Sequence, residues 1–254
     1  MLNSALTFRF QSQTMDQWTA EIRRWPMVGL LTFGLISNTL TVLVLSRAKL
    51  RKNTCSLYLI GASVSNTICI IVSLFYFTLN NGFGYALTTR SRLLCKLLPY
   101  LYYSTLFLAS WFILLACTDR YCCTHPQAFI RRFSHVNTAK RLLVFLPLFS
   151  LLVHSHLLIY IDWIEMNRCT FLTFNFILFL YIYYVVFYAF MTPILYIIFA
   201  ILTIINVTKT KKRVVMTVLK YGPVIPLPKR RQTLNAQLLR MLLVQVFLFK
   251  EFHR

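Results

Sequence analysis

The chain has 254 residues and a net charge of +21, and its composition is 58% hydrophobic but only 13% charged. A soluble domain of this size needs a more polar surface, so the composition excludes an ordinary soluble protein and favours one that spans the lipid bilayer. The distribution of the basic residues argues against nucleic-acid binding, because they lie in short connectors between apolar runs. They do not form a polar face with interleaved aromatic residues.

Residues 1–25 are expected to form an extracellular tail, without the basic and apolar segments of a cleavable signal peptide. Beyond this tail, apolar windows recur, each close to the roughly 20 residues that a helix needs to cross the hydrocarbon core. The uncharged run 170–208 is longer than one span needs, which predicts a long or tilted fifth helix. The five predicted spans are 26–46, 56–79, 93–118, 142–161 and 174–207.

The connectors between these spans differ in charge. Eighteen Lys and Arg residues lie in 47–55, 119–141 and 208–240, against seven in 1–25, 80–96 and 162–172. Positively charged connectors remain in the cytoplasm, so the first set is predicted to be cytoplasmic and the N-terminus extracellular.

The third window connects two residues that are expected on opposite sides of the membrane. Cys95 precedes Arg120 by 25 residues, which is about 37 Å of helix. Cys169 lies in the next extracellular connector, where oxidising conditions favour a Cys95–Cys169 disulfide. Asp119, directly before Arg120, is the only acidic residue between Ile22 and Ile161.

These features resemble the rhodopsin-like (class A) G-protein-coupled receptors across most of the chain. GLISNTLTVLVL contains Asn38 and FMTPILYIIF contains Pro193, each at the family's pattern position in its helix. LYLIGASVSN matches the second-helix pattern through Leu57, Tyr58, Leu59 and Ser65. Cys95 and the Asp119-Arg120-Tyr121 motif have the family's spacing. The resemblance implies an all-α membrane protein, a seven-transmembrane receptor-type bundle, here with five full spans and a partial sixth at 241–249. Domain bounds of 26–249 for the bundle and 250–254 for an aberrant tail follow.

The resemblance also implies a mechanism. Asp119 would hold Arg120 at rest, and Arg120 would turn toward a heterotrimeric G protein on activation, with Tyr121 completing the switch. The alternative is an arginine that extends to the membrane surface beside an unrelated acid. Asn66 replaces the family's sodium-binding Asp, so sodium regulation is not expected.

An amine ligand is not expected, since Tyr102 stands where amine receptors carry an Asp. An extracellular peptide is the expected ligand. Tyr102, Tyr103 and Phe171 are candidate pocket residues, with lipid-facing aromatics as the alternative. The segment MTPILYIIFAILTIINV is similar to neuropeptide receptors. Localisation at the plasma membrane is expected, with retention in the endoplasmic reticulum as the alternative for a truncated form.

Other functions have weaker support. Neither a nucleophile–base pair nor a metal cluster is apparent, so no enzyme activity, metal or cofactor is expected. His154 and His156 are two residues apart and should lie on different sides of a helix. Transporter repeats are also not apparent. The main alternative is a non-signalling, truncated receptor isoform that is retained or that associates with full-length receptors in an oligomer. Cys122 and Cys123 are either palmitoylated or free thiols.

Overall fold

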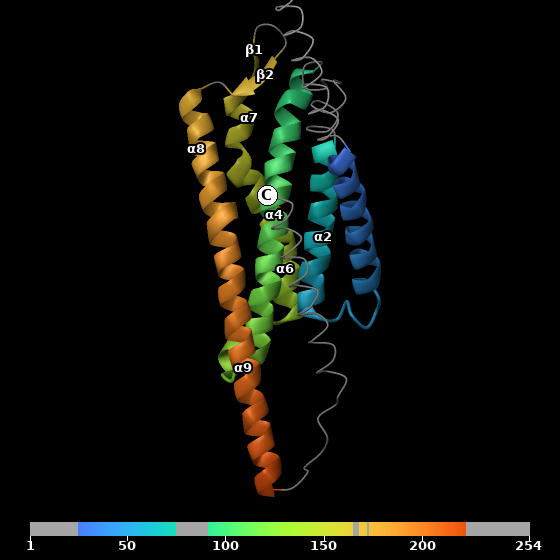
Figure 1. Cartoon of the computed structure of the whole chain (residues 1–254), viewed down its shortest axis with the longest axis vertical. Coiled ribbons are helices and arrows are strands. Elements are labelled where there is room, and N and C mark those ends of the chain that lie inside the picture. Colours follow the sequence, from blue (N-terminus) through green and yellow to red (C-terminus); the bar gives the residue numbers. More distant parts are fainter. Residues whose placement is uncertain (1–24, 75–90, 165–167, 172, 222–254) are drawn as a thin grey trace, which may run out of the picture.

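The computed structural model describes residues 25–74, 91–164, 168–171 and 173–221. Within these residues, five helices are long and apolar enough to span a membrane, and they lie alongside one another in an elongated bundle (Figure 1). The predicted helical membrane bundle is therefore confirmed. The predicted extracellular tail, apart from Trp25, lies outside the described residues, as do the predicted partial sixth span and aberrant tail. The five helices cover Trp25–Leu45, Thr54–Ser73, Arg92–Thr124, Val136–Tyr160 and Phe174–Thr210.

The fourth helix begins earlier in the structure than its apolar window in the sequence. It begins at Val136, whereas the predicted window begins at residue 142. Its first residues, VNTAKR, are polar, so they fall outside an apolar window although they already form helix α6, Val136–His154. Apolar periodicity detects the part of a helix that crosses lipid, whereas the backbone helix continues into the polar boundary.

Helix α4, Arg92–Thr124, forms the centre of the bundle. It packs against α2 (Thr54–Ser73), α6 and α9 (Thr192–Tyr221). Of its most apolar window, 61% is buried, compared with 17% for the first and fifth spans, so α4 is the interior helix. With 33 residues it is about 50 Å long, which exceeds the roughly 30 Å hydrocarbon core. Both ends of α4 therefore reach the polar boundaries.

Hydrogen bonds from side chains to backbone carbonyls connect α4 to its neighbours. The hydroxyl of Ser150 on α6 donates to the carbonyl of Ser104 at 2.8 Å. The hydroxyl of Tyr196 on α9 donates to the carbonyl of Ser110 at 2.7 Å. In lipid there is no hydrophobic force between helices, and such bonds contribute about 0.6 kcal/mol each, along with close packing.

Small residues let α2 approach its neighbours closely. A Cβ added at Gly61 would lie 2.8 Å from a methyl carbon of Leu143 and 3.2 Å from the ring of Phe112. Ala62 and Ser63, which follow it, are fully buried. This close contact between α2, α4 and α6 is the small-residue packing on which membrane helices depend.

The fifth span is one long helix with a change of winding. It consists of α8 (Phe174–Tyr184), the π-helical segment η2 (Val185–Met191) and α9. The widened turn precedes Pro193, which lacks an N–H and whose ring would clash with the carbonyl four residues earlier in a regular helix. The hydroxyl of Thr192 donates to the carbonyl of Phe187, which helps to satisfy the widened turn. The expectation of a long fifth helix is confirmed.

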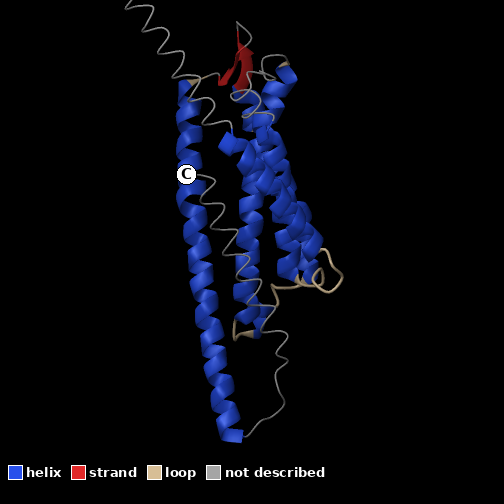
Figure 2. Cartoon of the chain, turned by 45° about the vertical axis from the view of Figure 1, so that its right-hand side comes forward, coloured by secondary structure: helices blue, strands red, loops and turns tan. Residues whose placement is uncertain are grey.

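A small hairpin adds two short strands to the predicted helical bundle. After the short helix α7, His156–Tyr160, strand β1 (Ile161–Ile164) pairs with β2 (Arg168–Phe171) in antiparallel register, with Trp163 opposite Cys169. Figure 2 shows the two strands at one end of the bundle. The strands are four residues long, too short for periodicity to distinguish them from a loop.

The arrangement of His154 and His156 corrects the sequence interpretation. Helix α6 ends at His154 and α7 begins at His156, so a turn at Ser155 interrupts the regular helix within this span. The two imidazole rings stack, with centroids 6.2 Å apart, instead of pointing to different sides. Each ring also places Nδ1 at hydrogen-bonding distance from a backbone carbonyl, of Ser150 and Val153 respectively. No cluster of three or more metal-ligating side chains occurs within the described ranges.

Candidate functional site

Helix α4 carries the predicted functional residues at its two ends. Cys95 lies in its first turn and Asp119-Arg120-Tyr121 lies in its last two turns. Because α4 is a continuous helix, the two groups are separated by the full thickness of the bundle, as Figure 1 shows for the ends of α4. We call these regions the hairpin end and the C-terminal end.

At the C-terminal end, both members of the charged pair are buried, with 5% of Asp119 and 6% of Arg120 exposed. The guanidinium of Arg120 donates from Nη2 to the amide oxygen of Asn53 at 2.8 Å. The same oxygen accepts from the backbone N–H of Cys55 at 3.3 Å, so Asn53 is the N-cap of α2. Arg120 is thereby tied to the first turn of α2 through a charge-assisted hydrogen bond.

Asp119 is bound by the segment between α5 (Ala128–Arg131) and α6. The hydroxyl of Ser134 donates to Oδ1 of Asp119 at 2.5 Å. The Ser134 oxygen also lies 2.8 Å from the sulfur of Cys123. Asn53, Asp119, Arg120 and Ser134 therefore form one arrangement, which we call the C-terminal cluster. An ion pair between Asp119 and Arg120 stays a prediction, whereas these bonds to Asn53 and Ser134 are observed.

Tyr121 lies beside the cluster and is half-buried. Its ring centroid is 5.4 Å from that of His125 and 6.0 Å from that of Phe199 on α9. Tyr121 thus contacts the helix of the fifth span. Of the two cysteines that follow, Cys122 is buried and Cys123 is exposed, and both are free thiols.

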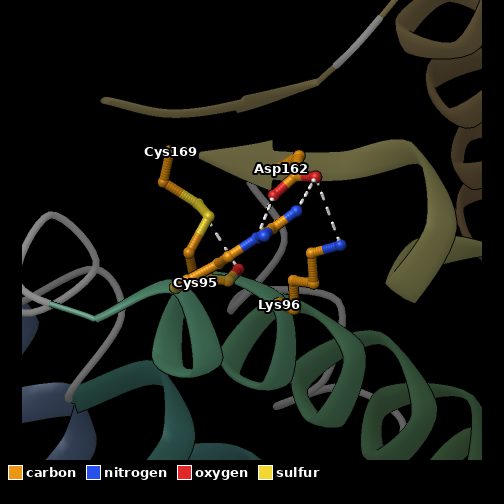
Figure 3. The surroundings of a disulfide bond; sticks show 5 residues. Cys95, Lys96, Asp162 and Cys169 are labelled. Carbon is orange, nitrogen blue, oxygen red and sulfur yellow. Dashed lines mark hydrogen bonds and ion pairs between the residues drawn. A yellow bond between two sulfur atoms is a disulfide. The ribbon is translucent and has the colours of Figure 1, made fainter. Parts of the chain in front are cut away.

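The hairpin end contains the disulfide that the sequence predicts. Cys95 and Cys169 are bonded, which connects β2 to the first turn of α4 (Figure 3). Beside it, the carboxylate of Asp162 on β1 receives two hydrogen bonds from Arg92, at 2.9 and 2.8 Å. Lys96 lies 3.4 Å from the same carboxylate. The disulfide and the charged group of Arg92, Lys96 and Asp162, which we call the Asp162 cluster, therefore connect the hairpin to α4.

Two of the candidate pocket residues, Tyr102 and Tyr103, lie on α4 and contact the fifth span. Tyr102 and Tyr103 are half-buried, and their ring centroids are 5.2 Å apart. Tyr103 also meets the ring of Tyr184 at 6.1 Å, and Tyr102 packs against a cluster that includes Tyr188. Both rings therefore contact neighbouring aromatic side chains of the bundle. The side chain of Phe171 lies outside the described part of the structure.

The three predicted core residues have different environments. Asn38 is 9% exposed, and its amide nitrogen donates to the carbonyl of Gly34 in its own helix at 2.8 Å. Asn66 is half-buried in α2. Pro193 is half-buried and lies in the first turn of α9, next to the π-helical segment.

Several residues of the two ends were missed by sequence interpretation. Asn53 carried a local signal, because an Asn before an apolar run is a typical N-cap. No local sequence signal identifies Ser134, Asp162 or Tyr196, because their partners are distant in the sequence. The Ser134–Asp119 contact spans 15 residues and the Tyr196–Ser110 contact spans 86.

A search with models of protein families finds no family that matches the chain. One stretch of 100 residues is 36% identical to human (Homo sapiens) C-C chemokine receptor type 1. This stretch covers 38% of the chain and 26% of the length of that receptor. The matched protein is, by its name, a receptor. This likeness to a receptor agrees with the five helices that are long and apolar enough to span a membrane.

Proposed function

We propose that the protein is a rhodopsin-like G-protein-coupled receptor that binds an extracellular peptide and activates a heterotrimeric G protein. The observation that carries this proposal is the architecture of α4. One interior helix bears a disulfide-anchored hairpin at one end and a buried Asp119–Arg120 pair at the other. A helix of this kind can transmit a change in packing between the two sides of a membrane.

The proposed orientation places the hairpin end outside and the C-terminal end in the cytoplasm, at the plasma membrane. Eighteen of the Lys and Arg residues in the connectors are then cytoplasmic, as the charge bias of membrane proteins requires. The Cys95–Cys169 disulfide then lies in the oxidising compartment.

In the proposed mechanism, the C-terminal cluster stabilises the resting state. Arg120 is bonded to Asn53 on α2 and Asp119 to Ser134, so neither side chain is available to a partner. Activation would exchange these bonds for contacts with the G protein. A charge-assisted hydrogen bond contributes about 1.5–3 kcal/mol, a size that can separate two packings and still permit a ligand to shift the equilibrium.

The proposed ligand is a peptide. C-C chemokine receptor type 1 is, by its name, a receptor for a chemokine, which favours a polypeptide ligand here. Tyr102 and Tyr103 lie on the hairpin half of α4 and offer aromatic surface with a polar tip. Phe171, the last residue of β2, is proposed as the third contact.

Nucleotide exchange tests this proposal. The receptor, expressed from its complete coding sequence, is reconstituted with purified heterotrimeric G proteins, and uptake of a fluorescent GTP analogue is followed. Wild-type protein is expected to accelerate uptake, and Arg120→Ala to remove the acceleration without loss of folded protein. Arg131→Ala is the matched control, because it removes an exposed arginine from the same end of the bundle. Equal exchange by wild type and Arg120→Ala would contradict the mechanism. If the wild-type protein accelerates uptake by no G protein, the result would favour the alternative of a non-signalling isoform.

A further inference from the structure

Ser134 occupies a position in which a change of its charge would affect the C-terminal cluster directly. Its hydroxyl donates to Asp119 and contacts Cys123, and the residue is half-buried in the bend between α5 and α6. The bend contains no regular structure at Ser134 and His135. The hydroxyl can therefore rotate outward without unfolding a helix.

The residues before Ser134 have the charge pattern of a kinase substrate. Arg131 and Arg132 precede it by three and two residues in the sequence RRFS, and both side chains are exposed, as is Phe133. Kinases select substrates by charge, and those with an acidic substrate groove require arginine at such positions. The pattern and the exposure together mark the segment as accessible to such an enzyme.

A second segment has similar charges, but its hydroxyl is buried. Thr54 follows Arg51 and Lys52 at the same two distances, but it is 6% exposed and lies in the first turn of α2. Its hydroxyl cannot enter a kinase site without unwinding α2. The spacing also recurs before Thr233, outside the described residues, so any labelling must be assigned to individual residues.

We propose that Ser134 is a phosphorylation site for an arginine-directed serine kinase, and that the phosphate opens the C-terminal cluster. The Ser134 oxygen would attack the terminal phosphorus of a nucleoside triphosphate. The bond between that phosphorus and the bridging oxygen breaks, the nucleoside diphosphate leaves, and the kinase base takes the hydroxyl proton. The product has no hydrogen to donate to Asp119 and carries about two negative charges beside its carboxylate.

The expected consequence is separation of the bend from α4. Two like charges at hydrogen-bonding distance repel, and the exposed guanidinium groups of Arg131 and Arg132 offer the phosphate alternative partners. Asp119 then loses its bond to the bend. The inference that this separation regulates signalling rests on the proposed function, because the separation would alter the resting state of a receptor.

The modification is tested without a ligand or a G protein. Purified full-length chain in lipid nanodiscs is incubated with ATP and the catalytic subunit of cyclic-AMP-dependent protein kinase, and phosphorylated peptides are mapped by mass spectrometry. Thr233→Ala serves as the background. Ser134 is expected to be labelled and Thr54 to remain unlabelled. Arg131→Gln should reduce labelling of Ser134 severalfold, whereas Ser46→Ala, which removes an exposed hydroxyl without preceding arginines, should not.

Opening of the cluster has its own readout. Cys123 is the one exposed free thiol of the seven cysteines, all of which are described, and it touches Ser134. Its rate of maleimide alkylation is expected to rise severalfold after phosphorylation and in Ser134→Asp, and less in Ser134→Ala. Absence of label at Ser134 would overturn the site, and label without faster alkylation would overturn the opening. Failure of the receptor function alone would change neither result.

Discussion

At the scale of the residue, Asn53 combines two roles whose effects can be separated. Its amide oxygen caps α2 and also accepts from Arg120. Asn53→Ala should lower the free energy of unfolding by about 1 kcal/mol through loss of the cap. It should also raise basal nucleotide exchange about tenfold, because the bond that restrains Arg120 contributes about 1.5–3 kcal/mol. Thermal denaturation and GTP-analogue uptake measure the two effects.

A matched variant distinguishes these roles. Asn53→Ser keeps a capping hydroxyl for α2 but shortens the side chain that reaches Arg120. Stability close to wild type together with raised basal exchange would support the account. Wild-type exchange in Asn53→Ser would instead show that the cap alone determines the behaviour of Asn53→Ala.

The Asp162 cluster is expected to contribute little to stability. The side chain of Arg92 is 66% exposed, so solvent screens its ion pair with Asp162. Exposed ion pairs contribute about 0–1 kcal/mol. Asp162→Asn should therefore change the melting temperature only slightly, and less at high salt. A loss comparable to that of the disulfide would show that the charges, and not the covalent bond, position the hairpin.

At the scale of the element, the hairpin depends on its covalent link to α4. Disulfides that close long loops typically contribute about 2–5 kcal/mol, and this bond closes a loop with a sequence separation of 74. Cys95→Ser or Cys169→Ser should reduce delivery to the cell surface strongly, as measured by flow cytometry of a tagged protein. Cys123→Ser is the control, since Cys123 is an exposed free thiol. Normal delivery of both bridge variants would contradict the structural role of the bond.

The contact between α4 and α9 is held by a buried hydroxyl. Tyr196→Phe should cost about 0.6 kcal/mol and at most about 1.7 kcal/mol, the range for hydrogen bonds between membrane helices. Tyr181→Phe removes a hydroxyl from a side chain that is 68% exposed and should have no measurable effect. Thermal denaturation in detergent compares the two. Equal losses would mean that the bond from Tyr196 to Ser110 does not stabilise the pair.

The elements differ in how far their sequence determines them. The five spans were predictable because each is a long apolar run between charged connectors. The Cys95–Cys169 bond was predictable because the length of α4 fixes which cysteine reaches which side. The hairpin and the break at Ser155 could not be predicted from the sequence, because they depend on contacts between α4, α7 and the strands. For the same reason Ser134 and Tyr196 went unnoticed.

At the scale of the whole molecule, α4 is the connection between the two candidate sites. It is the most buried span, with the disulfide and the Asp162 cluster at one end and the C-terminal cluster at the other. The neighbouring helices expose large apolar side chains, such as those of Leu152 and Phe174, as a surface in contact with lipid requires. The proposed receptor function needs the two ends of α4 on opposite sides of the membrane.

The side on which Cys123 lies tests this requirement most directly. The thiol is exposed and three residues from Arg120, so it marks the C-terminal end of α4. A membrane-impermeant maleimide is applied to intact cells and to permeabilised cells, with Cys123→Ser as the blank. Labelling is expected only after permeabilisation, with Arg120 facing the cytoplasm. Labelling of intact cells would place Arg120 outside and contradict activation of a G protein by this cluster.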